Sequence, residues 1–330
     1  MAKIVRFHTI GSAEVLKLED LPLNAPGSGE VRLKVEAIGL NRAEVGFREG
    51  QYLYAPELPS RLGYEAAGTV DAVGEGVSNI HIGDRVSTVP AFSMRQYGVY
   101  GESAIVPAHA VAAYPDHLSP SEGTSIWMQY LTVYGVLIEY GRIQSGDHVL
   151  ITAASSSVGY AAIQMVKANG AVAIATTRGT AKKQLLLDAG ADHVIVTNDE
   201  DLTKRVMEIT AGKGADLIFD PVAGPLLETL AESAAQGATI FVYGTFAAAA
   251  PTPFPLMAAL NKGLSVRGYT VFEITRDPEK LERGKRYIYE SLQARTLKPV
   301  IDRTFKLDEI VEAHRYMESN QQNGKIVVTV

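Results

Sequence analysis

A short run of very small residues in the middle of the chain has the size and position of a loop that holds phosphate. The apolar run HVLITA leads into Ser155, Ser156 and Ser157, and Val158 and Gly159 then open a helix-length segment. Free backbone N–H groups and the helix dipole at such a turn form an anion site, and only small side chains let a pyrophosphate approach. The strict G-x-G-x-x-G pattern is missing, so the serines would serve an ordinary helix N-cap equally well.

Basic residues follow the next apolar run and indicate which dinucleotide the loop would hold. The run AVAIATT ends at Thr177 and continues into Arg178 and Lys182, and no Asp or Glu occurs between Asp147 and Asp188. In a dinucleotide-binding fold an acid at this point meets a free ribose 2′-hydroxyl, whereas cations meet a 2′-phosphate. Arg178 would act as a forked clamp and Lys182 as a point charge. These residues predict NADPH, with Thr177 at the edge of the same site.

The elements that must position these groups alternate along the chain. From Asp147 onward, nearly continuous apolar runs of strand length alternate with runs of helix length, which is typical of a parallel sheet buried on both faces. We therefore predict a doubly wound α/β domain over residues 121–267. Ligands bind outside the carboxyl ends of such strands. Gly244 and Phe246, after the fifth run, are thus expected beside the nicotinamide, and Tyr269 at the substrate end.

The flanking residues are of a different kind. Residues 1–120 contain short β-branched runs separated by Gly and Pro, which predicts a β-rich domain. The segment 268–330 ends in the strand-like run GKIVVTV. Its most economical place is back against the β-rich domain, which makes that domain discontinuous.

Composition excludes several classes of site. The 330 residues contain no cysteine, so disulfides, thiolate zinc sites and iron–sulfur clusters are impossible. The 7 histidines form no H-x-H or H-x-x-x-H pair, so we expect no metal. A formal net charge of −6 argues against nucleic acid as a partner. Neither a signal peptide nor an apolar run of membrane length is visible, so we expect a cytoplasmic protein with a small-molecule substrate and no membrane partner.

Several spaced motifs carry a family pattern along essentially the whole chain. They are GLNRAE (39–44), REGQY (48–52), LGYEAAG (62–68), GDRV (83–86), GES (101–103), LTVY (131–134), the serine-rich loop, AGAD (189–192) and DPV (220–222). With them the chain resembles the zinc-independent quinone oxidoreductase-like and enoyl reductase-like branch of the medium-chain dehydrogenase/reductase superfamily. The resemblance implies a GroES-like β-rich catalytic domain of residues 1–120 and 268–330, a Rossmann domain of residues 121–267, NADPH and a homodimer.

Two departures from the wider superfamily bear on mechanism. In zinc-dependent members the position of Asn41 is a cysteine ligand, and the position of Tyr64 is the histidine of a Gly-His-Glu motif; neither residue is a ligand here. A catalytic zinc polarises a carbonyl as a Lewis acid. Acceptors that spread the incoming charge, such as quinones and α,β-unsaturated carbonyls, are favoured without it. Tyr64 is expected to fill the vacated space, either as pocket lining or as a purely structural residue.

The resemblance also assigns residues near the nicotinamide. Tyr52 matches a loop tyrosine of the enoyl reductase-like relatives, where it looks like a proton donor to the enolate; otherwise it is an aromatic that packs on the domain surface. Asn41 would hydrogen-bond the ribose or the acceptor oxygen. Thr132 resembles a cofactor position and Tyr134 a pocket position, although their spacing also suits core packing.

The expected activity is hydride transfer from NADPH to a quinone or an α,β-unsaturated carbonyl without a metal, with Tyr52 or water as the proton donor. Two alternatives remain open. One is an alcohol dehydrogenase-like reductase of simple carbonyls, and the other is a non-catalytic NADPH-binding sensor of the same fold. The serines of the loop either add hydroxyl contacts to phosphate or mark a subfamily with a tighter approach.

Overall fold

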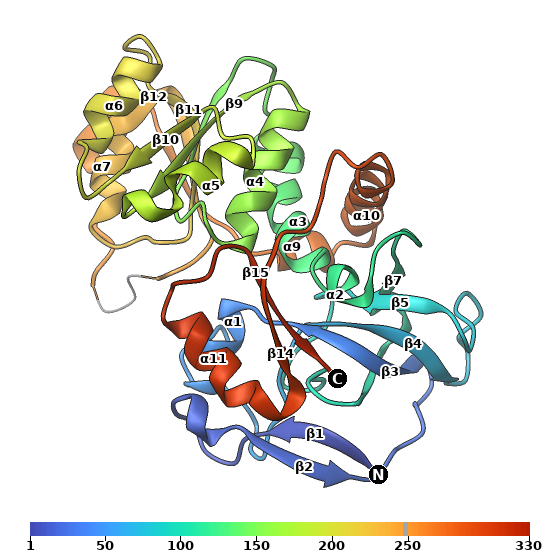
Figure 1. Ribbon diagram of the computed structural model, residues 1–330. Coiled ribbons are helices and arrows are strands. Elements are labelled where there is room, and N and C mark those ends of the chain that lie inside the picture. The colour runs from blue at the N-terminus through green and yellow to red at the C-terminus, as the bar shows by residue number, and fades with distance from the viewer. Residues whose placement is uncertain (247–249) are drawn as a thin grey trace. The chain divides into compact units, whose positions relative to one another are not determined.

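The computed structural model describes residues 1–246 and 250–330, and its chain divides into two compact units (Figure 1). Unit 1 consists of Met1–Gln129, Thr275–Gln293 and Lys298–Val330. Unit 2 consists of Tyr130–Ile274 and Ala294–Leu297. Within the described residues, no helix is both long and apolar enough to cross a membrane.

Unit 2 is built on a parallel sheet of six strands in the order β10-β9-β8-β11-β12-β13. The strands are β8 (His148–Ile151), β9 (Val172–Thr177), β10 (His193–Val196), β11 (Ala215–Asp220), β12 (Ala234–Val242) and β13 (Ser265–Gly268). The chain runs outward from β8 to β10 and then returns to β11 on the other side of β8. The strand order therefore reverses between β8 and β11, which is where doubly wound folds bind ligands.

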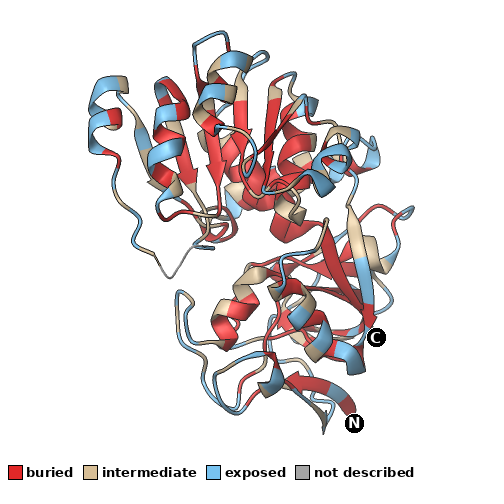
Figure 2. Ribbon diagram, turned by 60° about the vertical axis from the view of Figure 1, so that its left-hand side comes forward, coloured by how far each residue is buried: buried red, intermediate tan, exposed pale blue. Residues whose placement is uncertain are grey.

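Helices bury both faces of this sheet. Leu150, Ile174 and Ile218 pack into the apolar cluster beneath α6, α7 and α8, while the alternating Val149 and Ile151 are equally buried on the other face. Figure 2 shows the strands of unit 2 mostly buried and the outward sides of its helices exposed. The helical elements are α3 (Trp127–Tyr134), the π-helix η3 (Gly135–Tyr140), α4 (Ser157–Ala168), η4 (Thr180–Lys182), α5 (Lys183–Asp188), α6 (Leu202–Ile209), α7 (Leu226–Ser233), α8 (Leu256–Lys262) and α9 (Phe272–Thr275). This is the predicted doubly wound fold.

Unit 1 is built on a seven-stranded sheet in the order β14-β15-β3-β4-β5-β7, with β6 paired to β3. The strands are β3 (Glu30–Gly39), β4 (Glu65–Val73), β5 (Arg85–Thr88), β6 (Ser103–Pro107), β7 (Val111–Ala113), β14 (Ile301–Lys306) and β15 (Lys325–Thr329). A separate hairpin joins β1 (Ala2–Arg6) to β2 (Lys17–Leu21). The strand β15 pairs with β3, with Val327 opposite Gly39, so both ends of the chain build one sheet as predicted.

Short helices complete unit 1. They are η1 (Ala13–Val15), α1 (Arg42–Arg48), η2 (Ala108–Ala110), α2 (Pro120–Gly123), α10 (Pro278–Gln293), η5 (Leu307–Glu309) and α11 (Ile310–Glu318). A capping box starts α1, because the side chain of Glu44 accepts from the backbone N–H of Asn41 at 2.7 Å. This cap brings Asn41 and Glu44 to the carboxyl end of β3.

The units meet along the chain a few residues beyond the boundaries predicted at 120 and 268. The indole N–H of Trp127 donates to Ser87 Oγ at 2.8 Å, which holds the start of α3 in unit 1. Tyr269 belongs to unit 2, because its hydroxyl donates to the Leu131 carbonyl at 3.4 Å. Tertiary contacts of single side chains therefore decide where each unit begins.

Candidate functional site

The serine-rich loop of unit 2 joins β8 to α4 in a tight turn. Ser156 is the N-cap of α4, and its hydroxyl accepts from the Gly159 N–H at 3.0 Å. A side chain at Gly159 would place its Cβ 2.3 Å from the Ala154 carbonyl oxygen, so only glycine permits this packing. Ala153 adopts a φ of 46°, in the left-handed region. The helix cap is compatible with the predicted anion site, because the first-turn N–H groups of a capped helix still point outward.

The predicted cations lie directly beyond β9. The Nζ atom of Lys182 donates to Ser155 Oγ at 3.2 Å, which links the cation to the phosphate loop. Arg178 is exposed, and no carboxylate of the described chain forms an ion pair with it. Thr177 is buried and donates to the Gly179 carbonyl at 3.3 Å. The end of β9 therefore carries positive charge beside the loop, as a 2′-phosphate requires.

A buried carboxylate lies at the switch point between β8 and β11. Asp220 accepts from the Thr152 hydroxyl and from the backbone N–H groups of Val222 at 3.2 Å and Ala223 at 2.7 Å. Burial raises the pKa of Asp220, while these hydrogen bonds act in the opposite direction. The side chain fixes the turn after β11 against the start of the phosphate loop.

An unsatisfied hydroxyl follows β12 at the same edge of the sheet. The Tyr243 ring stacks on Phe219 with centroids 4.1 Å apart, and its buried hydroxyl makes no hydrogen bond of normal geometry among the described residues, although the Ser156 side chain acts to lower its pKa. A Cβ atom on the neighbouring Gly244 would lie 2.8 Å from the Pro221 carbonyl oxygen. A buried polar group without a partner is costly. The small turn, the helix N-terminus, the cations and this hydroxyl together fit a dinucleotide that carries a 2′-phosphate.

The other predicted residues of unit 2 lie around α3 and after β12. Thr132 is buried. The Tyr134 hydroxyl donates to Glu139 Oε2 at 3.3 Å, and the Tyr269 ring packs against Gly135. Phe246 is 47% exposed. Both tyrosine hydroxyls have partners within unit 2, so the pocket roles predicted for Tyr134 and Tyr269 stay predictions.

In unit 1 a closed polar network surrounds Asn41. The Nζ atom of Lys325, at the start of β15, donates to Asn41 Oδ1 at 2.7 Å and to Glu65 Oε2 at 2.5 Å. The Asn41 amide nitrogen donates to Glu65 Oε2 at 3.2 Å and to Glu44 Oε1 at 3.3 Å. The side chains of Lys325 and Glu65 are 0% and 1% exposed. Both the oxygen and the nitrogen of the Asn41 side-chain amide therefore have partners within unit 1. A direct contact of Asn41 with the ribose or the acceptor stays a prediction.

Glu44 extends this network toward a buried tyrosine. It accepts from the Tyr100 hydroxyl at 2.5 Å and from the Tyr64 backbone N–H at 2.9 Å. Burial raises the pKa of Glu44, although these hydrogen bonds act against the increase. Each oxygen of the carboxylate has at least two donors, which is how a buried charge is tolerated.

These residues do not form a zinc site. The side chains of Asn41 and Tyr64 hold a lysine and other tyrosines, and the chain contains no cysteine. Among the described residues no three His, Asp or Glu side chains gather as metal ligands would. Zinc sites need thiolate, imidazole or carboxylate donors that converge on one point. We therefore derive no step through zinc.

Tyr52 and Tyr54 form a cluster around Tyr64, the residue that the family resemblance places at the position of a zinc-binding histidine. The Tyr64 hydroxyl lies 2.7 Å from that of Tyr54 and donates to that of Tyr52 at 3.4 Å. Phe47 packs edge-on against Tyr52 and Tyr54, with centroids 6.4 and 5.7 Å apart. Tyr64 is fully buried, whereas Tyr52 and Tyr54 are partly exposed. Burial raises the pKa of Tyr52, so its hydroxyl keeps its proton at neutral pH.

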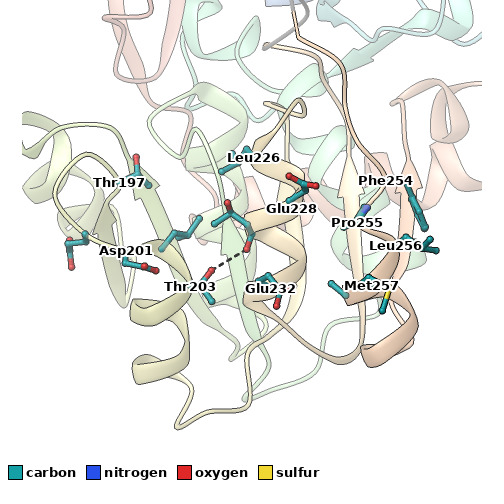
Figure 3. A pocket seen from close by; sticks show the side chains of 14 residues that line it. Thr197, Asp201, Thr203, Leu226, Glu228, Glu232, Phe254, Pro255, Leu256 and Met257 are labelled. Carbon is teal, nitrogen blue, oxygen red and sulfur yellow. Dashed lines mark hydrogen bonds between the residues drawn. The ribbon is translucent and has the colours of Figure 1, made fainter.

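A large groove lies elsewhere on unit 2 (Figure 3). Its volume is about 930 Å³, and residues of α6, α7 and the segment that leads into α8 line it. Its wall combines the carboxylates of Asp201, Glu228 and Glu232 with Phe254 and Met257. None of the predicted site residues lines this groove.

Sequence reasoning missed several residues of these clusters. Lys325, Tyr54 and Tyr243 are not among the predicted site residues, Asp220 appears only inside a family motif, and Glu65 is expected only as a buried structural acid. A single lysine at the start of the apolar run GKIVVTV was the one available signal for Lys325. Charged residues are rarely buried without a partner, so such a lysine in a core strand indicates a buried acid elsewhere.

Comparison with known proteins agrees with this geometry. The family described as alcohol dehydrogenase GroES-like domain matches residues 27–116, and the family described as zinc-binding dehydrogenase matches residues 157–283. The chain is 30% identical to a quinone oxidoreductase of Homo sapiens over 99% of this chain and 98% of that protein. A crystal structure of Escherichia coli quinone oxidoreductase complexed with NADPH has a TM-score of 0.91 at 29% identity, covering 100% of both chains. An NAD-dependent alcohol dehydrogenase has a TM-score of 0.89 at 30% identity, covering 99% of each chain.

Proposed function

Because the chain belongs to the quinone oxidoreductase-like branch of the medium-chain dehydrogenase/reductase superfamily, we propose that it reduces quinones or α,β-unsaturated carbonyls without a metal. The protein is an oxidoreductase, and NADPH is its cofactor. The proposal concerns the acceptor and the residues that act on it.

The observation that carries the proposal is the cluster of three tyrosine hydroxyls that includes Tyr64, the position at which the family resemblance places a zinc ligand. Tyr64 and its partners Tyr52 and Tyr54 offer O–H groups and no Lewis acid. A conjugated acceptor takes hydride at carbon and delocalises the charge to oxygen, so a hydrogen-bond donor suffices. An isolated ketone would lose its main electrophile.

The chain's own residues bind the cofactor and supply the proton. When bound, NADPH supplies the hydride from its nicotinamide ring. Arg178, Lys182 and the N-terminus of α4 would hold its phosphates, and Tyr243 would offer a buried hydroxyl to the dinucleotide. Tyr52 donates the proton that the reduced acceptor needs, because a neutral phenol in a partly buried site can act as a general acid. A direct role of Asn41 would require its amide to exchange a partner, since Lys325 and Glu65 hold it.

The test is a panel of acceptors with purified protein and NADPH, followed by absorbance of the reduced nicotinamide. We expect turnover with 1,4-quinones or conjugated enals and little with simple ketones. Turnover mainly with simple ketones or alcohols would overturn the acceptor class and favour the alcohol dehydrogenase-like alternative. Binding of NADPH without turnover of any acceptor would favour the non-catalytic sensor.

Exposed apolar side chains support a homodimer through unit 2. The strand β13 is an outer strand of its sheet. Leu256, Met257 and Leu260 of α8 are 55%, 66% and 68% exposed. We propose that two copies pair at this edge and that the protein works in the cytoplasm. Light scattering should give the mass of a dimer, and Leu260→Asp should weaken it; a monomer at micromolar concentration would contradict the pairing.

A further inference from the structure

We propose that Tyr52, Tyr64 and Tyr54 form a hydroxyl relay that returns a proton to Tyr52 after Tyr52 has protonated the reduced acceptor. The proposal rests on the proposed function, because it takes Tyr52 as the proton donor. It adds Tyr64 and Tyr54 as positioning residues that act through Tyr52.

The hydrogen bonds of the cluster can point in one direction. The Met94 backbone N–H donates to Tyr54 Oη at 3.0 Å. Either hydroxyl can donate in the 2.7 Å contact between Tyr54 and Tyr64; when Tyr64 gives its single proton to Tyr52 Oη, 3.4 Å away, Tyr54 is the donor in that contact. The Tyr52 proton is then not committed within the cluster. The order of donors leaves the outermost proton available to an acceptor at Tyr52.

The relay shortens the time for which Tyr52 carries a negative charge. A tyrosine that has lost its proton becomes an anion, and burial disfavours that anion. The Tyr64 hydrogen bond acts against this effect and lowers the pKa of Tyr52. The charged groups that bear on Tyr52 are Glu44, which raises its pKa, and Arg276, which lowers it. Burial raises the pKa of Tyr64 further still, so the proton of Tyr54 has to move to Tyr64 as the proton of Tyr64 moves to Tyr52.

The far end of the relay suits a transient negative charge. Tyr54 is partly exposed and accepts from the Met94 N–H. The Arg95 guanidinium lies 5.6 Å from the centroid of the Tyr54 ring and 3.4 Å from Glu57 Oε1. A backbone N–H and a nearby cation stabilise an anion at Tyr54 better than the interior does at Tyr64.

The step balances as follows. The acceptor carbon gains the hydride from NADPH, and the resulting enolate or phenolate takes the proton of Tyr52, whose O–H bond breaks. The proton of Tyr64 moves to Tyr52, the proton of Tyr54 moves to Tyr64, and water at the exposed side protonates Tyr54. Hydroxide is left in solvent, so the net reaction consumes one hydride and one proton.

The first test titrates position 52 in protein without cofactor. A fluorinated tyrosine of low intrinsic pKa replaces Tyr52, and absorbance follows its ionisation in otherwise native protein, in Tyr64→Phe and in Tyr97→Phe. Loss of the Tyr64 hydrogen bond should raise the pKa at position 52 by about one unit, since hydrogen bonds to a charged group are worth that much. Tyr97 is the matched control, because its hydroxyl binds Glu30 at 2.7 Å outside the relay. An unchanged pKa in Tyr64→Phe would overturn the relay.

The second test measures kinetics with a saturating conjugated acceptor. Tyr52→Phe should lower kcat at least 100-fold, as expected for loss of a general acid. Tyr64→Phe and Tyr54→Phe should lower kcat about tenfold with little change in KM, and Tyr97→Phe should leave both unchanged. The proton inventory in mixed light and heavy water should be curved for the native protein and linear for Tyr64→Phe.

The outcomes separate the relay from the proposed function. If Tyr52→Phe keeps full turnover, the donor assignment fails and the relay with it. If Tyr52→Phe is slow while Tyr64→Phe and Tyr54→Phe are as fast as the native protein, the donor stands and the relay fails. If Tyr64→Phe proves unstable, Tyr54→Phe at the exposed end still decides the matter, because its ring contacts remain.

Discussion

The two regions that carry the chemistry-bearing residues differ in how their polar groups are satisfied. In unit 1, Asn41, Glu44, Glu65 and Lys325 are buried and bind one another. At the carboxyl end of the unit 2 sheet, Arg178 has no ion pair among the described residues and the Tyr243 hydroxyl makes no hydrogen bond of normal geometry there. We call the first region the closed network and the second the open edge.

The difference in how the polar groups are satisfied indicates which of the two regions binds a ligand. A polar group that already has its partners gains little from a ligand, whereas an unsatisfied group gains a full hydrogen bond. The open edge is thus suited to cofactor binding. The closed network holds the carboxyl end of β3 to the start of the last strand, through Lys325 and Asn41.

The largest effect should follow from breaking the closed network. Lys325→Met leaves the Glu65 carboxylate buried without its cation, and loss of one partner of a buried ion pair costs about 3–5 kcal/mol. We expect the free energy of unfolding to fall by that amount. Chemical denaturation followed by the fluorescence of Trp127, the single tryptophan and a residue of unit 1, measures it.

The double variant Lys325→Met/Glu65→Gln is the control for this prediction. Removing both charges leaves no unpaired ion, so much of the lost stability should return. If Lys325→Met alone were as stable as the native protein, the network would not hold unit 1 together.

The second effect concerns a buried histidine in the same unit. The Arg48 guanidinium donates to His314 Nδ1 at 2.9 Å, so the imidazole is neutral and its proton lies on Nε2. Burial, with Arg48 adding to it, lowers the pKa of His314 from 6.5 to about 3. Between about pH 3 and pH 6.5 the imidazole of His314 binds a proton in the unfolded chain but not in the folded chain. Stability from this group is therefore complete above pH 6.5 and declines as the pH falls toward 3.

The decline should be about 1.4 kcal/mol for each pH unit in that window, or about 3–5 kcal/mol in all. His314→Gln should remove this part of the pH dependence, and denaturation curves from pH 7 to pH 4 measure it. The exposed His81→Gln serves as the matched control. An identical pH dependence in His314→Gln and the native protein would show that the imidazole is not held neutral.

A smaller effect should follow at the open edge. Arg178→Ala removes the predicted phosphate clamp, and loss of a hydrogen bond to a charged group costs about 1.5–3 kcal/mol. NADPH binding should weaken about 10- to 100-fold by fluorescence titration, with NADH binding and protein stability unchanged. The exposed neighbour Lys183→Ala should bind NADPH like the native protein. Equal losses for NADPH and NADH would refute the clamp.

The smallest effect tests strain in the phosphate loop. Ala153 has a φ of 46°, which an alanine adopts at a cost of about 1 kcal/mol. Ala153→Gly should therefore raise the free energy of unfolding by up to about 1 kcal/mol. Ala154→Gly, at a buried position outside the left-handed region, should lower it. A loss of stability in Ala153→Gly would place the strain elsewhere.

The sequence predicted the elements better than the contacts between them. The runs HVLITA and GKIVVTV became β8 and β15, because β-branched residues in short apolar runs favour strands. The end of α7 is less visible in the sequence, because the whole run PLLETLAESAAQ is rich in helix-forming residues, yet α7 ends at Ser233 and β12 begins at Ala234. Alanine carries no β-branched signal, so only the pairing with β11 places it in the sheet.

The candidate site divides along the same line. The predicted phosphate loop and its cations are local features, and spacing along the chain alone indicates them. The pairing of Lys325 with Asn41 and Glu65 joins residues 284 and 260 positions apart. No local sequence pattern predicts a contact over such a separation. The hydrogen-bond partners of Asn41 and Tyr64 are therefore known only from the structure.

The same separations set the order in which the two regions can form during synthesis. The contacts of the open edge join residues 27 and 68 positions apart, in the pairs Lys182 with Ser155 and Thr152 with Asp220. The closed network cannot form before β15 has been synthesised, and the ribosome makes β15 after all of unit 2. Until then Glu44 and Glu65 lack their lysine, and the early strands of unit 1 stay open to water and to chaperones. Unit 2 should therefore mature first on the nascent chain, and unit 1 should close last.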